Sequence, residues 1–367
     1  MILLLLYGLC DYVLTLVEYS DPIFNVIVRI LWIINVLFSY LTSIVSLFFT
    51  VTRNRNRMTN VLCLLSRADN KLFRSNSKQS AYSQHRSQVI TQLWIMLILS
   101  GTVITSFTHS YADGTWKSYA NAASHTLSNL INAVMIYQYV NIVQMVKQSY
   151  QRVKHMLSEE AITDDVSYFR HTSVEILKSC KNHQVFSIVT HNLKSGRESY
   201  NLCRIHNFRV IYSELYGLLN YNKSYEVTLL LDVTARLTFT VPTMYQGVMF
   251  IKVAILENGP FQVHFSGISM LSLFAFMLFT LLWLTLCCQK TTEEVDDIFI
   301  CIQNLLLYQN ALGWSTSELK SFSSRLKNNK VEFDVCVFFT LNLQFFCASV
   351  SVIHTYILVL NQFSQGV

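Results

Sequence analysis

The chain has 367 residues, of which 52% are hydrophobic and only 14% are charged. A soluble domain carries about 25% charged residues and could not bury this much apolar surface, so the composition indicates a membrane protein. The formal net charge of +6 does not indicate nucleic-acid binding, because the basic residues lie between apolar runs, as they do in loops that flank transmembrane helices.

The apolar runs predict seven transmembrane helices. A helix needs about 20 mostly apolar residues to cross the hydrocarbon core. The candidates in chain order are 2–18, 23–51, 89–109, 118–146, 227–250, 262–287 and 335–363. The first run is short and contains Asp11, but it lacks the positively charged start and the small-residue cleavage site of a signal peptide. We therefore expect an all-α polytopic membrane protein.

The positions of Lys and Arg predict the orientation in the membrane. Of the 28 basic residues, 24 lie in the segments 52–88, 147–226 and 288–334. The positive-inside rule places these segments in the cytoplasm, with the N-terminus inside and the C-terminus outside. The segment 147–226 is long and contains no Pro, which favours long cytoplasmic helical extensions of the fourth and fifth transmembrane helices.

A further helix is expected between the sixth and seventh spans. Thr291 followed by Glu294 fits a capping box, and the run that follows contains Gln303 and Asn304, which argue against exposure to lipid. We interpret 288–334 as a cytoplasmic amphipathic helix that anchors the protein. Residues 1–287 then hold the first six transmembrane helices with the loops 52–88 and 147–226, and residues 335–367 hold the seventh helix.

The last predicted helix ends in a recognisable motif. Thr355 and Tyr356 are followed by five mostly hydrophobic residues and then by Gln362 and Phe363, with Asn361 as a polar departure. This pattern resembles the signature that closes insect gustatory receptors. The segment 337–342 resembles the segment that opens the same helix in that family. The resemblance extends over the whole chain in layout, but it is specific only in about the last 30 residues.

The resemblance implies a tastant-gated, non-selective cation channel of four subunits in the plasma membrane of a chemosensory neuron. In that family the last helices line a central pore, and the cytoplasmic ends of helices four to seven form the anchoring interface. The tastant binds in the outer half of each subunit. Sugar receptors often have Glu where this chain has Ile357, which favours a bitter or divergent ligand over the main sugar branch and leaves a fructose-receptor-like role open.

The motif supplies the candidate pore residues. Thr355, Val359 and Gln362 share one helical face, and Gln362 can offer an amide to ions while Phe363 forms a hydrophobic constriction. We expect Gln362, Phe363 and Val359 to form the pore or gate, with Thr355 and Tyr356 packing behind it. The alternative is that Gln362 only hydrogen-bonds a neighbouring helix.

Polar and aromatic side chains in the outer halves of two helices are candidates for ligand binding, as are those at the outer mouth. They are Trp116, His125, Asn129, Asn132, Tyr245 and Gln246. Hydrogen bonds between helices are the alternative for each of them. Asp232 and Arg236 are charged within a span, and the simplest expectation is an ion pair one helical turn apart.

Two other classes of seven-helix or transport protein compete with this interpretation. A G-protein-coupled receptor would have its N-terminus outside, and the chain lacks its Asp-Arg-Tyr and Asn-Pro-x-x-Tyr motifs. A secondary transporter would need buried carboxylates or helices broken by Gly or Pro, and the predicted spans are nearly free of both. The chain contains no H-E-x-x-H, G-x-S-x-G or P-loop pattern. We therefore expect that the protein is not an enzyme and that it binds no metal or cofactor. The expected partners are a tastant, the lipid bilayer, and further copies or related receptors, but not nucleic acid.

Overall fold

A computed structural model of the chain describes residues 26–49, 60, 63–64, 66–67, 90, 101, 116–178, 205–219, 225–256, 261–307 and 316–365. These residues are almost entirely helical, which confirms the predicted all-α fold class. The predicted spans 2–18 and 89–109 lie outside the described residues, apart from single positions, as does most of the loop 52–88.

Five long helices overlap the other predicted spans: α2 (Val26–Phe49), α5 (Trp116–Lys178), α7 (Glu226–Leu256), α8 (Phe261–Leu307) and α11 (Leu343–Gln365). Two shorter helices cover 205–219 and α10 (Thr316–Asn328). Within the described part of the chain, Glu226–Leu256, Gly267–Leu307 and Leu343–Gln362 are long and apolar enough to cross a membrane. The full count of seven spans remains a prediction.

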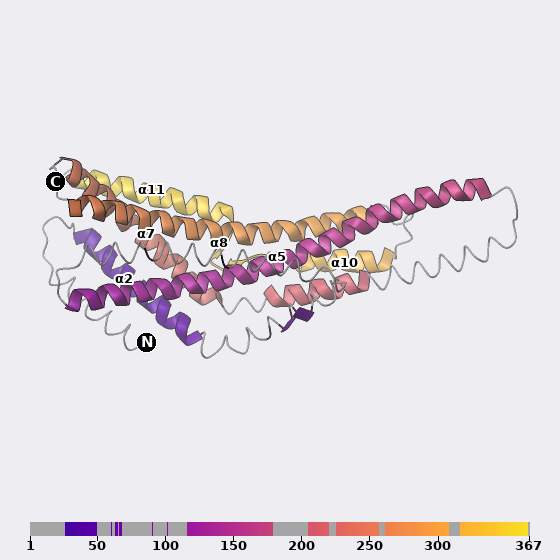
Figure 1. Ribbon diagram of the computed structural model, residues 1–367, viewed down its shortest axis with the longest axis horizontal. Helices are drawn as coiled ribbons and strands as arrows, with labels where there is room; N and C mark the ends of the chain where they lie inside the picture. Colours follow the sequence, from indigo (N-terminus) through magenta and orange to yellow (C-terminus); the bar gives the residue numbers. More distant parts are fainter. Residues whose placement is uncertain are drawn as a thin grey trace.

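The molecule is elongated, with α5 and α8 running side by side along it (Figure 1). One end, which we call the membrane bundle, holds α2, α7 and α11 with the adjoining parts of α5 and α8. The other part, the stem, consists of α5 from residue 147, helix 205–219, α8 from residue 290, and α10. Because α5 has 63 residues, it is about 95 Å long at 1.5 Å per residue. It therefore reaches well beyond a membrane of ordinary thickness.

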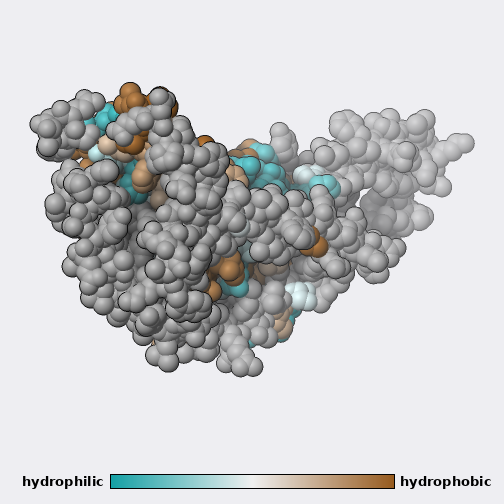
Figure 2. Space-filling view, turned by 60° about the vertical axis from the view of Figure 1, so that its left-hand side comes forward, coloured by the Kyte–Doolittle hydropathy of each residue, from teal (hydrophilic) through white to brown (hydrophobic). Residues whose placement is uncertain are grey.

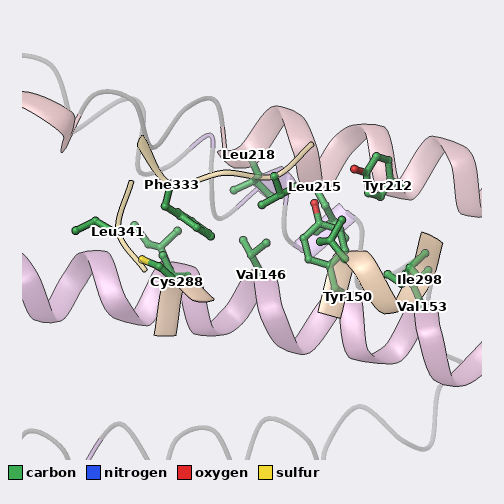
Figure 3. Close-up of a cluster of buried hydrophobic side chains, with 14 of the residues drawn as sticks. Val146, Tyr150, Val153, Tyr212, Leu215, Leu218, Cys288, Ile298, Phe333 and Leu341 are labelled. Atoms are coloured by element: carbon green, nitrogen blue, oxygen red, sulfur yellow. The ribbon is translucent and has the colours of Figure 1, made fainter. Parts of the chain in front are cut away.

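The main hydrophobic core lies where the stem meets the membrane bundle (Figure 3). Tyr150 from α5, Tyr212 and Leu215 from helix 205–219, and Ile298 from α8 are all fully buried there. Burial of an aliphatic side chain such as Leu215 or Ile298 stabilises the fold by about 1.5–3 kcal/mol relative to full exposure. In contrast, only 17% of the most apolar window of α11 is buried. Apolar side chains also reach the surface among the coloured residues of Figure 2.

The predicted start of a separate helix at Thr291 is wrong, because α8 passes through this position without a break. The Thr291 hydroxyl donates to the Cys287 carbonyl at 2.8 Å, one turn back in the same helix. Glu294 does not cap a helix but faces α5, where it accepts hydrogen bonds from Gln151 at 2.6 Å and from Lys154 at 3.3 Å. Lys154 also pairs with Asp297, and this hydrogen bond raises the pKa of the lysine.

The last helix does not begin at 335, as predicted, but at Leu343. Strands β1 (Asp334–Val335) and β2 (Phe339–Thr340) precede it and pair in antiparallel register. They are joined by a turn in which the Phe338 amide donates to the Val335 carbonyl at 3.0 Å. The φ angles of the two central residues, Cys336 and Val337, are 48° and 66°, as in a type I′ turn. This conformation takes the chain out of helix before Asn342, whose Oδ1 caps α11 by accepting from the Phe345 amide at 2.8 Å.

Two glycines let α7 and α8 approach closely in the membrane bundle. A Cβ atom on Gly267 would lie 2.8 Å from Cγ1 of Ile251 and 3.3 Å from the carbonyl oxygen of Gly247. A side chain at this position would therefore push the helices apart. Small residues at helix crossings are the usual means of close packing in membranes.

Candidate functional site

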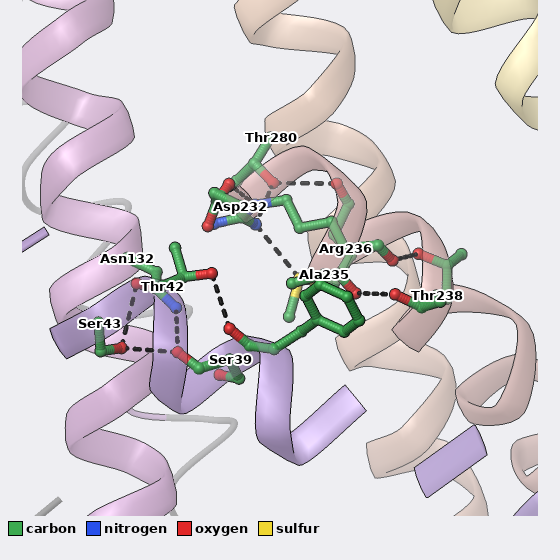
Figure 4. A network of polar contacts seen from close by, with 12 residues as sticks. Ser39, Thr42, Ser43, Asn132, Asp232, Ala235, Arg236, Thr238 and Thr280 are labelled. Carbon is green, nitrogen blue, oxygen red and sulfur yellow. Dashed lines mark hydrogen bonds and ion pairs between the residues drawn. The ribbon is translucent and has the colours of Figure 1, made fainter. Parts of the chain in front are cut away.

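A buried ion pair lies inside the membrane bundle, on α7 where this helix faces α8 (Figure 4). The Nε of Arg236 donates to Oδ2 of Asp232, one turn back in α7, at 2.6 Å. Only 6% of Arg236 and 1% of Asp232 is exposed. The arginine also reaches α8, where its Nη1 donates to the Thr280 hydroxyl at 2.8 Å and contacts the Met277 sulfur at 3.2 Å. The expected i,i+4 pair is therefore present, and it additionally joins α7 to α8.

A second polar network joins α2 to α5. The hydroxyl oxygens of Ser43 and Ser128 are 2.7 Å apart, and Ser43 donates to Oδ1 of Asn132 at 3.1 Å. The Asn132 amide nitrogen in turn donates to the Ser39 carbonyl at 3.3 Å. All four residues are buried. Asn132, a predicted ligand contact, therefore makes the interhelical hydrogen bonds that were its alternative role.

A small cavity of about 20 Å³ separates the two networks, and Ser39, Asn129, Asn132, Asp232, Ala235, Arg236, Phe239 and Met277 line it. This volume suffices for about one water molecule. The lining brings a guanidinium, a carboxylate and two amides to one point, which suits hydrogen bonding to a small polar group. The cavity is too small for a tastant without movement of the surrounding helices.

The structure brings only some of the predicted ligand-binding residues together. Asn129 and Asn132 both line the cavity. Tyr245 packs instead against the cluster between α7 and α11. Gln246 is buried, and its Nε2 has no hydrogen-bond partner among the described residues. Trp116 and His125 lie in α5, but their side chains are outside the described part.

Sequence reasoning left Asp232 and Arg236 out of the proposed site, although a charge within an apolar run is itself a signal of function. Phe239 and Met277 could not have been found from the sequence, because apolar residues at such positions are ordinary core residues. Their place beside the cavity depends on how α7 and α8 are rotated against each other. Only the packed helices supply that information.

The motif residues of α11 lie on a face that its own chain leaves open. Gln362 and Thr355 are exposed, 40% of Val359 is exposed, and 58% of Tyr356 is exposed. The packing of Tyr356 behind a pore therefore stays a prediction, which concerns assembled copies and not the single chain. The side chain of Phe363 is outside the described part, although its backbone belongs to α11.

The opposite face of α11 holds the helix against the bundle. Ile353 and Leu360 are buried and form a cluster with Val241 of α7, against which Tyr245 also packs. These two buried residues are seven apart, which is about two helical turns, so they define one contact stripe. α11 is consequently attached to the rest of its own chain along a narrow line, with most of the motif residues turned away.

Comparisons with known proteins agree with this architecture. The family model described as 7tm Chemosensory receptor matches residues 1–366. The insect olfactory receptor OR5 from Machilis hrabei, solved in complex with eugenol, has a similar structure with a TM-score of 0.63. The two chains are 14% identical, and the match covers 99% of this chain and 87% of the olfactory receptor. At this identity the likeness shows the fold alone. None of the curated proteins matches the chain.

Proposed function

Because this chain belongs to the 7tm chemosensory receptor family, we propose that it is a gustatory receptor that works as a tastant-gated, non-selective cation channel. As a member of the family it is a multi-pass plasma membrane receptor and not an enzyme. The finer assignment to taste rests on the motif Thr355-Tyr356 to Gln362-Phe363. An olfactory role is the alternative within the same family, since the related insect receptor was solved with the odorant eugenol.

The observation that carries the channel proposal is the open motif face of α11. Polar Thr355 and Gln362 and the apolar Val359 lie exposed on one side of a helix whose span is only 17% buried. Such a mixed stripe would be costly to leave against hydrocarbon but suits a wall of a water-filled pore. Four copies arranged around this face, with Gln362, Phe363 and Val359 at the gate, would complete the pore.

The tastant is proposed to bind in the membrane bundle on the outer side of the Asp232–Arg236 pair. Asn129 at the cavity and the half-buried Tyr245 and buried Gln246 on α7 are the candidate contacts. The free Nε2 of Gln246 supports a hydrogen-bonding ligand, because an unsatisfied buried donor costs about 1–3 kcal/mol. We propose a bitter compound or another ligand outside the main sugar branch, because the motif has Ile357 at the position where sugar receptors often have Glu.

The decisive test is whole-cell current in cells that express this chain alone, during application of a panel of sugars, bitter compounds and odorants. We expect a fast cation current that persists when G-protein signalling is blocked and that changes in ion selectivity in Gln362→Glu. The matched control is His354→Gln, because His354 is also exposed on α11 but lies about a quarter turn away from Gln362.

The outcomes separate the candidate functions. A current that disappears when G-protein signalling is blocked would contradict the channel proposal. Currents evoked only by volatile odorants would favour the olfactory role. If Gln362→Glu and His354→Gln have the same effect on selectivity, the proposed pore face of α11 is wrong even if the chain conducts.

A further inference from the structure

An open polar groove lies in the stem between helix 205–219 and α10, far from the cavity of the membrane bundle. Its volume is about 500 Å³, and among the described residues it is lined by Arg209, Ser321, Ser324, Arg325, Asn328 and Asn329. The volume is within the range of about 300–1,000 Å³ that is usual for small-ligand sites. All six side chains can donate a hydrogen bond, and none of them is acidic.

Arg209 is held in a fixed position at one wall of the groove. Its Nη1 lies 3.0 Å from Oε2 of Glu318 and donates to the Ser321 hydroxyl at 3.0 Å. Its Nη2 donates to Nδ1 of His206 at 3.0 Å. The Nε is buried without a hydrogen-bond partner among the described residues. The guanidinium is therefore pre-oriented, with part of its hydrogen-bonding capacity unused.

The opposite wall offers a second cation. Arg325 is exposed, and its side chain has no hydrogen bond or ion pair with any described residue. The end of α10 that carries it is fixed, because the Asn329 amide donates to the Arg325 carbonyl at 3.0 Å and the Asn329 carbonyl accepts from the Tyr212 hydroxyl at 2.8 Å. Tyr212 is fully buried in the core, so this wall is anchored to the stem.

Two guanidinium groups with hydroxyl and amide donors between them match the oxygen atoms of a phosphate group. A cation near the end of α10 also offsets the partial negative charge of the helix terminus. This interaction with the helix terminus would be enough to explain a basic residue at position 325 or 327. It does not explain why a second, pre-oriented arginine, Arg209, lies across an open groove from Arg325.

We propose that this groove binds a phosphate-bearing anion of about the size of an inositol phosphate or a nucleotide. The positive-inside rule assigns the stem to the cytoplasm, where such anions are available either free or as phospholipid headgroups. The proposal goes beyond tastant gating, because it gives the receptor a second binding site on the opposite side of the membrane from the tastant.

The test measures binding to the full chain, purified and reconstituted in nanodiscs of neutral phosphatidylcholine. Inositol hexakisphosphate is titrated as the free probe, and uncharged inositol is the negative control. A second arm uses nanodiscs that contain phosphatidylinositol 4,5-bisphosphate, without the free probe. Binding is followed by calorimetry and by the rise in melting temperature that a ligand specific for the folded state produces.

We expect saturable binding that weakens about tenfold in Arg325→Gln, as is typical when one charge-assisted hydrogen-bonding group is lost. Lys327→Gln removes the same charge from the same exposed helix end but lies outside the lining residues, so it should change binding less than about twofold. Binding of the free probe identifies a soluble ligand, and stabilisation only in the lipid arm identifies a headgroup.

Two results would overturn the proposal. If neither arm shows saturable binding, the groove is solvated surface. If Arg325→Gln and Lys327→Gln weaken binding equally, the anion is attracted by overall basic charge and not by this groove. Arg209→Gln is a second variant, and its circular dichroism and melting temperature show whether the stem still folds when the Glu318 contact is lost.

Discussion

The backbone amide of Leu343 donates to Oε1 of Gln289 at 2.9 Å. Leu343 is the first residue of α11, and Gln289 lies on α8, so a side chain of one helix caps the other. The glutamine is itself oriented by its Nε2, which donates to Oε1 of Glu293 at 2.8 Å. The proposed pore helix is thus tied to α8 at the point where it leaves the stem.

Replacing this cap should alter gating. In Gln289→Leu the Leu343 amide loses its partner, which costs about 1 kcal/mol and loosens the start of α11. We expect the ligand concentration for half-maximal current to shift by about fivefold, which corresponds to that energy. Lys290→Ala is the control, because Lys290 is exposed on the same turn. An unchanged dose–response curve in Gln289→Leu would show that this bond does not bias the channel.

The Asp232–Arg236 pair should tolerate joint replacement better than single replacement. Arg236→Leu leaves a buried carboxylate without its partner, at a cost of about 3–5 kcal/mol. We expect strongly reduced surface expression, measured by biotinylation, and partial recovery in the double variant Asp232→Asn/Arg236→Leu. The matched control Lys252→Leu removes an exposed charge from the same helix. Equal expression of the single and double variants would contradict a role for the pair in stability.

The turn before α11 should become more stable with a glycine. Val337 has a φ of 66°, which costs a β-branched residue about 1–2 kcal/mol, while 97% of the residue is exposed and little packing would be lost. Val337→Gly should therefore slow thermal inactivation of the solubilised receptor. Phe338→Gly removes a neighbouring side chain that is also exposed and should not. Faster inactivation of Val337→Gly would mean that this side chain has a partner in the assembled receptor.

The two asparagines at the cavity should differ in their response to alanine. Asn132 makes hydrogen bonds to α2, so Asn132→Ala should lower surface expression by breaking a buried network. We expect Asn129→Ala, and likewise Tyr245→Ala, to reduce ligand potency more than expression. Dose–response curves normalised to surface protein separate the two effects. Parallel loss of potency and expression in all three variants would remove the support for a ligand site here.

The sequence was sufficient for the approximate places of the described long helices, because each depends on a local excess of apolar residues. α2 and α7 begin and end within a few residues of the predicted spans, or extend them by one or two turns. The long extension of α5 was also predicted, from a segment without Pro. The ends of the helices were harder to predict from the sequence. A capping pattern at Thr291 is indistinguishable in sequence from a mid-helix threonine whose hydroxyl bonds the preceding turn.

The sequence by itself determined that this chain is an all-helical membrane receptor, and that its last helix carries a motif resembling the one in gustatory receptors. Tertiary structure alone decided that Asn132 bonds to α2, that Arg236 reaches α8, and that Arg209 and Arg325 share a groove. Apolar periodicity and charge bias are properties of neighbouring residues and can be read along the chain. Contacts between helices depend on their rotation and crossing, which are set by the packing of side chains far apart in sequence.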